Sequence, residues 1–229
     1  MSRTTALTFL AVLSLAVAAA LAVPSPTADE SEATVTVDGT VDLPGEPTSV
    51  ADSRTAVSGT VGVAPGEPVR ATVSPGGDGP VTVALVDASG ERHAAETVDE
   101  SGRVSVSTDG LDTGTYYLVV GDAERGVQRV VVSAADVSLS RTESNGSGLS
   151  TRVGVIPHSE VSYDAVELVV TDGETARRYT ATPVRDGLYE ASVPERDLPA
   201  GRYEVYARLV DDSGEYVGTS DPLTVSGGG

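Results

Sequence analysis

The chain of 229 residues carries 34 acidic residues against 15 basic ones, for a formal net charge of −19, and it contains no cysteine. Without cysteine, disulfides, thiol nucleophiles, zinc–thiolate sites and a lipid-modified cysteine at an export signal are all excluded. The longest basic run is Arg177–Arg178. The sequence therefore lacks the positive footprint that nucleic-acid binding requires, and it is a poor match for an anionic membrane surface.

All the basic residues are arginine, and the acidic residues are spread along the chain. Residues 33–134 hold 15 acids and 6 arginines, and residues 135–226 hold 16 and 8, so no acidic tail accounts for the charge. Such a surface repels itself at ordinary ionic strength, whereas molar salt shortens the Debye length to about 3 Å and strengthens apolar burial. The composition predicts a protein of a very salty environment. A GC-rich genome is the alternative; it would replace lysine by arginine without leaving acids more than twofold in excess.

The N-terminus has the pattern of an export signal. Arg3 precedes the apolar run Ala6–Val23, in which Ala20-Leu21-Ala22 has the small-x-small form that signal peptidase recognises. We predict a signal peptide over residues 1–22, cleaved after Ala22, and a polar linker over residues 23–32. The alternative is an uncleaved anchor that tethers the protein to the membrane, because the run over residues 6–23 would form a helix about 27 Å long, near the minimum for a bilayer.

From Ala33 onward, apolar and polar residues alternate with a period of two, in short runs separated by Gly, Pro, Asp and Ser. This pattern is typical of half-buried antiparallel strands. One run places Val81, Val83 and Leu85 on a single face. Another places Tyr203, Val205, Ala207 and Leu209 opposite Arg202, Glu204, Tyr206 and Arg208. No window beyond the N-terminal segment keeps helical spacing, so we expect an all-β fold.

The body of the chain is an internal repeat. Asp87 and Asp172 each end an apolar run, and a Gly follows fifteen residues later in both copies. Leu111-x-x-Gly114-x-Tyr116 then matches Leu198-x-x-Gly201-x-Tyr203, at an offset that grows from 85 to 87 residues. Each copy has the size of an immunoglobulin-like sandwich of about seven strands. We predict two tandem immunoglobulin-like antiparallel β-sandwiches with separate cores, over residues 33–134 and 135–226, followed by a Gly tail over residues 227–229.

The shared motif predicts a structural role for Tyr116 and Tyr203. Its Gly would make the turn into the next strand. The Tyr ring would then be buried and its hydroxyl bonded to nearby backbone, as in a tyrosine corner.

Two segments carry a resemblance to a known group of modules. Ser58-Gly59-Thr60-Val61-Gly62-Val63-Ala64-Pro65-Gly66-Glu67, followed by Val69–Val73, resembles the opening strands of Ig-like modules in haloarchaeal cell-surface and S-layer-associated proteins. Leu198-Pro199-Ala200-Gly201-Arg202-Tyr203 resembles their late-strand signature. The resemblance covers most of residues 53–226 and implies a modular extracellular scaffold, often glycosylated. The chain lacks the C-terminal anchoring signal of the surface-layer pattern.

Asn145 is the candidate modification site. It is the only Asn in the sequence and lies in the sequon Asn145-Gly146-Ser147, within a polar stretch where exposure is expected. We expect N-glycosylation of this residue if the chain is exported. The alternative is a simple Asn-Gly turn between two strands.

Other candidate chemistry is weak. Asp109-Gly110-Leu111-Asp112 and Asp211-Asp212-Ser213-Gly214 are acidic turns, but neither matches a calcium loop, and Asp and Gly are common in turns. His93 is expected in a strand and His158 in a loop, both at the surface, with no nucleophile elbow or His-Glu-x-x-His motif in the chain. We therefore predict no catalytic residues, no metal site and no cofactor.

The resulting prediction is a non-enzymatic structural, adhesive or protein-interaction module, exported to the cell surface of a halophile. One alternative is an envelope-tethered accessory subunit that binds a solute or ligand, and a pocket between the two sandwiches would favour it. The other is an enzyme whose site is assembled from loop carboxylates, which two close, buried carboxylates in one cleft would favour.

Overall fold

The computed structural model describes residues 33–51, 53–77, 79–121, 127–144, 148–158 and 162–227. These residues form an all-β fold of four sheets, with one 3₁₀ turn, η1 (Glu195–Asp197). The predicted signal peptide, its cleavage at Ala22, the linker and Asn145 lie outside the described residues. Within the described ranges, no helix is long and apolar enough to span a bilayer.

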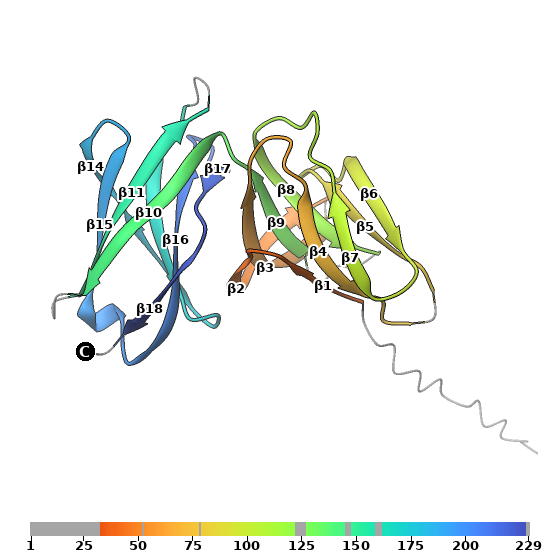
Figure 1. The fold of residues 1–229 in the computed structure, drawn as a ribbon, viewed down its shortest axis with the longest axis horizontal. Helices are drawn as coiled ribbons and strands as arrows, with labels where there is room; N and C mark the ends of the chain where they lie inside the picture. The colour runs from red at the N-terminus through yellow and green to blue at the C-terminus, as the bar shows by residue number, and fades with distance from the viewer. Residues whose placement is uncertain are drawn as a thin grey trace, which may run out of the picture.

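The first half of the chain forms two sheets (Figure 1). One has the order β1-β4-β7 and the other the order β2-β3-β9-β8-β5-β6. The strands are β1 (Thr34–Val37), β2 (Val41–Val50), β3 (Ser53–Val63), β4 (Val69–Ser74), β5 (Val81–Val86), β6 (Arg92–Val98), β7 (Gly102–Val106), β8 (Gly114–Val120) and β9 (Val127–Val132).

The second half also forms two sheets. One has the order β10-β11-β15-β14. In the other, of order β13-β12-β16-β17, β18 also pairs with β16. The strands are β10 (Ala135–Ser144), β11 (Gly148–Pro157), β12 (Ala165–Thr171), β13 (Ala176–Thr180), β14 (Thr182–Arg185), β15 (Leu188–Pro194), β16 (Gly201–Val210), β17 (Tyr216–Thr219) and β18 (Leu223–Gly227).

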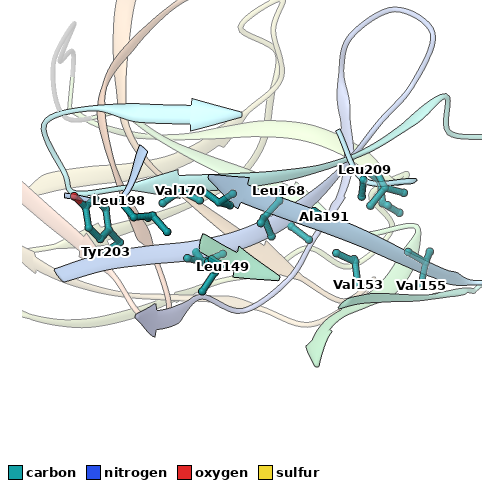
Figure 2. Close-up of a cluster of buried hydrophobic side chains, with 14 of the residues drawn as sticks. Leu149, Val153, Val155, Leu168, Val170, Ala191, Leu198, Tyr203 and Leu209 are labelled. Carbon is teal, nitrogen blue, oxygen red and sulfur yellow. The ribbon is translucent and has the colours of Figure 1, made fainter. Parts of the chain in front are cut away.

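Each half encloses its own apolar core between its two sheets. Strand β4 illustrates the origin of the first core, because Val69, Ala71 and Val73 alternate with exposed residues and face the larger sheet. In the second half, Leu149 and Val153 of one sheet pack with Leu168 of the other (Figure 2). Strands whose apolar residues recur every second position can bury only one face against such a core.

The two copies of the repeat occupy matching places. Asp87 directly follows β5 and Asp172 directly follows β12, and these two strands pair antiparallel with β8 and β16. The predicted role of the repeated tyrosines is confirmed: Tyr116 and Tyr203 are buried, and their hydroxyls donate to the carbonyls of Asp112 and Pro199 at 3.1 and 3.0 Å.

Three features differ from the prediction. The described residues form nine strands in each half instead of about seven, in part because β2 adds a hairpin to β3. Strand β9 pairs parallel with β3, so the two strands begin at the same end of the sheet, whereas only antiparallel pairs were predicted. The cores are also not fully separate, because a third apolar cluster contains residues of both halves.

Candidate functional site

The segment that joins the two halves is short and hydrogen-bonded on both sides. Only Ser133 and Ala134 separate β9 from β10, and both are buried. The Ser133 N–H donates to the Val63 carbonyl in the first half at 2.9 Å. The Ala134 N–H donates to the Val217 carbonyl in the second half at 2.8 Å. Neither residue is therefore a free pivot.

The third apolar cluster lies across this junction. From the first half it includes Leu43, Val57 and Tyr117, and from the second half Val169 and Tyr206. Tyr206 is 1 % exposed, although it lies on the face of β16 that the alternating pattern assigns to solvent. The outer surface of the larger first-half sheet covers this face of β16. Strand β16 is therefore buried on both faces there, and buried and exposed residues no longer alternate along it.

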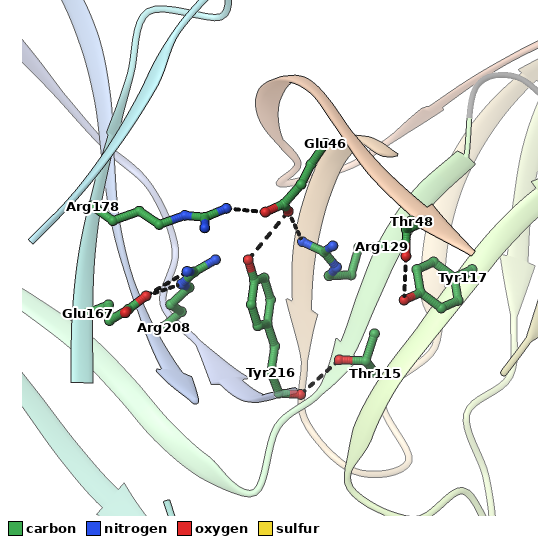
Figure 3. A network of polar contacts seen from close by, with 9 residues as sticks. All are labelled: Glu46, Thr48, Thr115, Tyr117, Arg129, Glu167, Arg178, Arg208 and Tyr216. Carbon is green, nitrogen blue, oxygen red and sulfur yellow. Dashed lines mark hydrogen bonds and ion pairs between the residues drawn. The ribbon is translucent and has the colours of Figure 1, made fainter. Parts of the chain in front are cut away.

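Tyr216, at the start of β17, lies between two guanidinium groups (Figure 3). Arg129 of β9 is 4.3 Å from the ring centroid and Arg208 of β16 is 4.2 Å from it. The side chains of Arg129 and Arg208 are only 8 % and 5 % exposed. Because one arginine comes from each half, the ring bridges the two halves through a pair of desolvated cation–π contacts, each worth up to about 2 kcal/mol.

Glu46, on a bulged part of β2, links the same groups. Its carboxylate accepts hydrogen bonds from Arg129 at 2.7 Å, from Arg178 of β13, and from the Tyr216 hydroxyl at 3.4 Å. Burial acts to raise the pKa of Glu46, but the Arg129 hydrogen bond and the charges of Arg129, Arg178 and Arg208 lower it below its ordinary value. Glu46 is therefore a carboxylate at neutral pH, and it ties a first-half strand to a second-half strand.

Further contacts complete the junction. Glu167 accepts from Nε of Arg208 at 2.7 Å and so holds that guanidinium against the ring. Thr115 donates to the Tyr216 carbonyl at 3.0 Å. Gly62 allows β17 to come close, because a Cβ on this residue would lie 2.5 Å from Thr219 Cγ2. Paired buried charges add little net stability, but they disfavour every arrangement that leaves one of them unpaired. The arrangement therefore fixes orientation; no bond-making chemistry follows from it.

Three hollows lie along the junction, each lined by residues of both halves. One of about 180 Å³ includes Arg129 and Glu215, another of about 180 Å³ includes Glu67 and His158, and one of about 220 Å³ includes Leu43 and Arg178. All are smaller than the roughly 300–1,000 Å³ of typical ligand pockets.

The acidic turns predicted as weak cation candidates have structural partners. Asp211 accepts from the Ser213 hydroxyl at 2.7 Å and from the Glu215 N–H at 2.8 Å, and the Ser213 hydrogen bond is the main cause that lowers the pKa of Asp211. The carbonyl of Asp112 accepts from Tyr116. Among the residues that the structure describes, no three potential ligands gather as a metal site would require.

Both histidines are exposed, as predicted. His93 lies in β6, as expected, with Nε2 3.3 Å from Asp87 and its ring edge-on to Tyr116. His158 follows β11, with Nε2 2.8 Å from Asp136 Oδ1. His158 lines one of the hollows along the junction, but neither histidine contacts Glu46, Arg129, Arg208 or Tyr216 in the hydrogen bonds and ion pairs of the described residues.

Sequence reasoning did not identify Glu46, Arg129, Arg208 or Tyr216. One signal was present: Arg129 lies within β9, directly before the apolar run Val130–Val132, and all six residues of this strand are buried. A charged residue in such a strand implies a buried partner. The partners come from distant parts of the chain, so their identity requires the structure.

No protein-family model and no curated protein matches the chain. Among solved structures, the BSP domain of a biofilm-associated protein is 20 % identical, with a TM-score of 0.27, covering 71 % of this chain and 28 % of that one. A tetra-tandem repeat from the extending region of a large adhesion protein is 17 % identical, with a TM-score of 0.30, covering 86 % and 49 %. The chain thus spans less than half of each of these structures. With TM-scores this low, neither similarity carries an argument about this protein.

Proposed function

We propose that this protein is a non-enzymatic structural or adhesive module of a halophile's cell surface, which acts as a stiff two-domain spacer or protein-interaction unit. The observation that carries the proposal is the junction, where the buried Arg129–Tyr216–Arg208 stack holds the halves in one orientation. The proposed domains are two immunoglobulin-like sandwiches over residues 33–134 and 135–226.

A stiff junction matters because domains in one chain usually move relative to one another unless their interface is large and apolar. Here an apolar cluster, a charged stack and a hydrogen-bonded link act together. A spacer needs this property, since a flexible joint would not hold a binding surface at a set distance from the cell. The two similar structures come by description from a biofilm protein and an adhesion protein, which agrees with the proposal but does not support it independently.

The proposal includes export and processing. Cleavage after Ala22 would release the mature chain, whereas retention of residues 6–23 would leave a membrane tether. Asn145 would carry a glycan, and the predicted Gly tail of residues 227–229 would be reduced to residues 228 and 229, because Gly227 ends β18. Intact-mass measurement of the protein recovered from the envelope and medium tests cleavage and glycosylation, because loss of residues 1–22 and addition of a glycan change the mass separately.

Small-angle X-ray scattering in molar salt tests the spacer role. We expect a scattering curve that fits one fixed arrangement of the two halves, together with capture of envelope components in a pull-down from a salt-rich extract. A curve that requires a broad range of interdomain angles would reject the spacer. Turnover of an envelope glycan or peptide by the purified protein would reject the non-enzymatic assignment.

A second candidate, a ligand-binding accessory subunit, is favoured by the hollows between the halves. Their volumes of about 180 to 220 Å³ restrict this candidate to very small ligands.

A further inference from the structure

We propose that the hollow beside Arg129 is a binding site for a small monovalent anion the size of a halide. The hollow is about 180 Å³, and its walls come from β2, the β5–β6 turn, β8 and β9 of the first half and from residues 214–216 of the second. The proposal deepens the spacer function and depends on it, since a bound anion would join the halves at the junction.

The first argument is the charge that lines the hollow. The Arg129 side chain is 8 % exposed, and among the described residues its guanidinium donates from Nη1 to Glu46. Arginine has five N–H donors. Donors that do not reach Glu46 can therefore serve a ligand in the hollow that Arg129 lines. Figure 3 shows the guanidinium between Glu46 and the pair formed by Thr48 and Tyr117.

The second argument is the local balance of charge. Arg129, Arg178 and Arg208 face Glu46 and Glu167 in the cluster, which leaves one positive charge in excess. The Arg178 side chain is 50 % exposed, whereas those of Arg129 and Arg208 are 8 % and 5 % exposed. Because Glu46 is shared between Arg129 and Arg178, it neutralises the buried Arg129 only in part, and an anion beside Arg129 would complete that neutralisation.

Glu215 also lines the hollow and opposes an anion there. Its side chain is exposed, unlike that of Arg129, so water screens its charge more effectively. The neighbouring carboxylate of Asp211 is occupied by its own turn, where it accepts from Ser213 and from the Glu215 N–H. Arg129 therefore dominates the potential inside the hollow.

The third argument is the supply of hydroxyl donors. The hydroxyls of Thr48 and Tyr117 lie 3.2 Å apart, and either can donate to the other. One hydrogen bond between them uses one of their two protons, and the other proton is free to donate to a ligand. Thr115 donates to the Tyr216 carbonyl and supplies nothing further. The site thus offers a guanidinium and one hydroxyl, and both donate to an anion. The hollow itself is too small for a larger metabolite.

Crystals of the protein grown in sodium bromide test this proposal directly. We expect an anomalous bromide peak in the hollow, within hydrogen-bonding distance of Arg129 and of Thr48 or Tyr117. A peak only at exposed arginines such as Arg103 would mean an adventitious ion only, and it would overturn the proposal. Water density without an anomalous signal in the hollow would overturn it as well.

Chlorine NMR line broadening gives a second test in solution. The double variant Thr48→Val with Tyr117→Phe removes the hydroxyl donors and leaves Arg129, Glu46 and Tyr216 in place. We expect its apparent chloride affinity to fall about tenfold, because loss of one hydrogen bond to a charged group weakens binding by about this factor. The matched control is Thr97→Val with Tyr179→Phe, outside the hollow, which should keep the wild-type broadening. Equal broadening in both double variants would contradict the site.

These results can be separated from the spacer proposal. Scattering curves of the wild type in chloride show whether the halves form one rigid body, whatever the fate of the anion. A rigid body without bromide in the hollow would reject the anion site and leave the spacer standing.

Discussion

Replacing Tyr216 should loosen the junction more through loss of its ring than through loss of its hydroxyl. In Tyr216→Leu, both guanidinium contacts, at 4.3 and 4.2 Å, disappear. At roughly 1 to 2 kcal/mol for each desolvated contact, the loss is about 2 to 4 kcal/mol. Tyr216→Phe keeps the ring and loses only the long hydrogen bond to Glu46 at 3.4 Å, so we expect a change below about 1 kcal/mol.

Urea unfolding in molar salt, followed by both circular dichroism and scattering, would measure this difference. Wild type and Tyr216→Phe should unfold at similar urea concentrations, whereas Tyr216→Leu should unfold earlier and show a spread of interdomain angles before it unfolds. Tyr179→Leu is the matched control: this half-buried tyrosine bonds to Asp197 inside the second half, so its loss should lower stability without changing the interdomain angle. If the Leu and Phe variants of Tyr216 behaved alike, the cation–π stack would not hold the halves together.

Four further outcomes are expected. Glu46→Gln should remove a part of the stability that depends on pH. The pKa of Glu46 in the folded protein lies below its ordinary value of 4.5, so the Glu46 carboxylate stabilises the fold fully above pH 4.5 and loses this effect as the pH falls through the folded pKa. The difference in melting temperature between wild type and variant, followed from pH 7 downward, measures the loss. Gly62→Ala should cost about 1 to 3 kcal/mol in urea unfolding, because the new Cβ would lie 2.5 Å from Thr219 Cγ2 and 3.1 Å from the Thr219 carbonyl oxygen; an unchanged midpoint would disprove this close approach. Tyr203→Phe should cost about 1 kcal/mol through loss of the hydrogen bond to Pro199, measured by the same titration. The melting temperature of the wild type should rise steeply from dilute buffer to molar sodium chloride, and equal, equally sharp melts would refute the surface-repulsion argument.

The alternating patterns predicted the all-β fold and the places of the repeated landmarks, because a strand with one buried face records that burial in its own sequence. Strand β4 shows this in its buried residues Val69, Ala71 and Val73. The same logic failed where both faces are covered: Arg208 lies on the side of β16 expected to face solvent, yet its side chain is 5 % exposed.

The candidate site could not be predicted for the same reason. Glu46 and Tyr216 are 170 positions apart, and nothing in the local sequence of either one records the other. Their meeting depends on how the second half packs on the outer face of a first-half sheet. Local periodicity reports that a face is buried but not which residues cover it.

In molar salt, burial decides whether charged contacts can hold the two halves of the chain together. Screening over about 3 Å in molar salt weakens pairs of exposed charges, such as Arg70 and Glu67, whose side chains are 60 % and 50 % exposed. The side chains of Arg129 and Arg208 are 8 % and 5 % exposed, so salt screens their contacts with Glu46, Glu167 and Tyr216 much less, and these contacts persist. Salt therefore reduces the repulsion among surface carboxylates while it leaves the junction intact. A protein whose halves were joined only by exposed ion pairs would lose that connection in the same molar salt that screens its surface carboxylates.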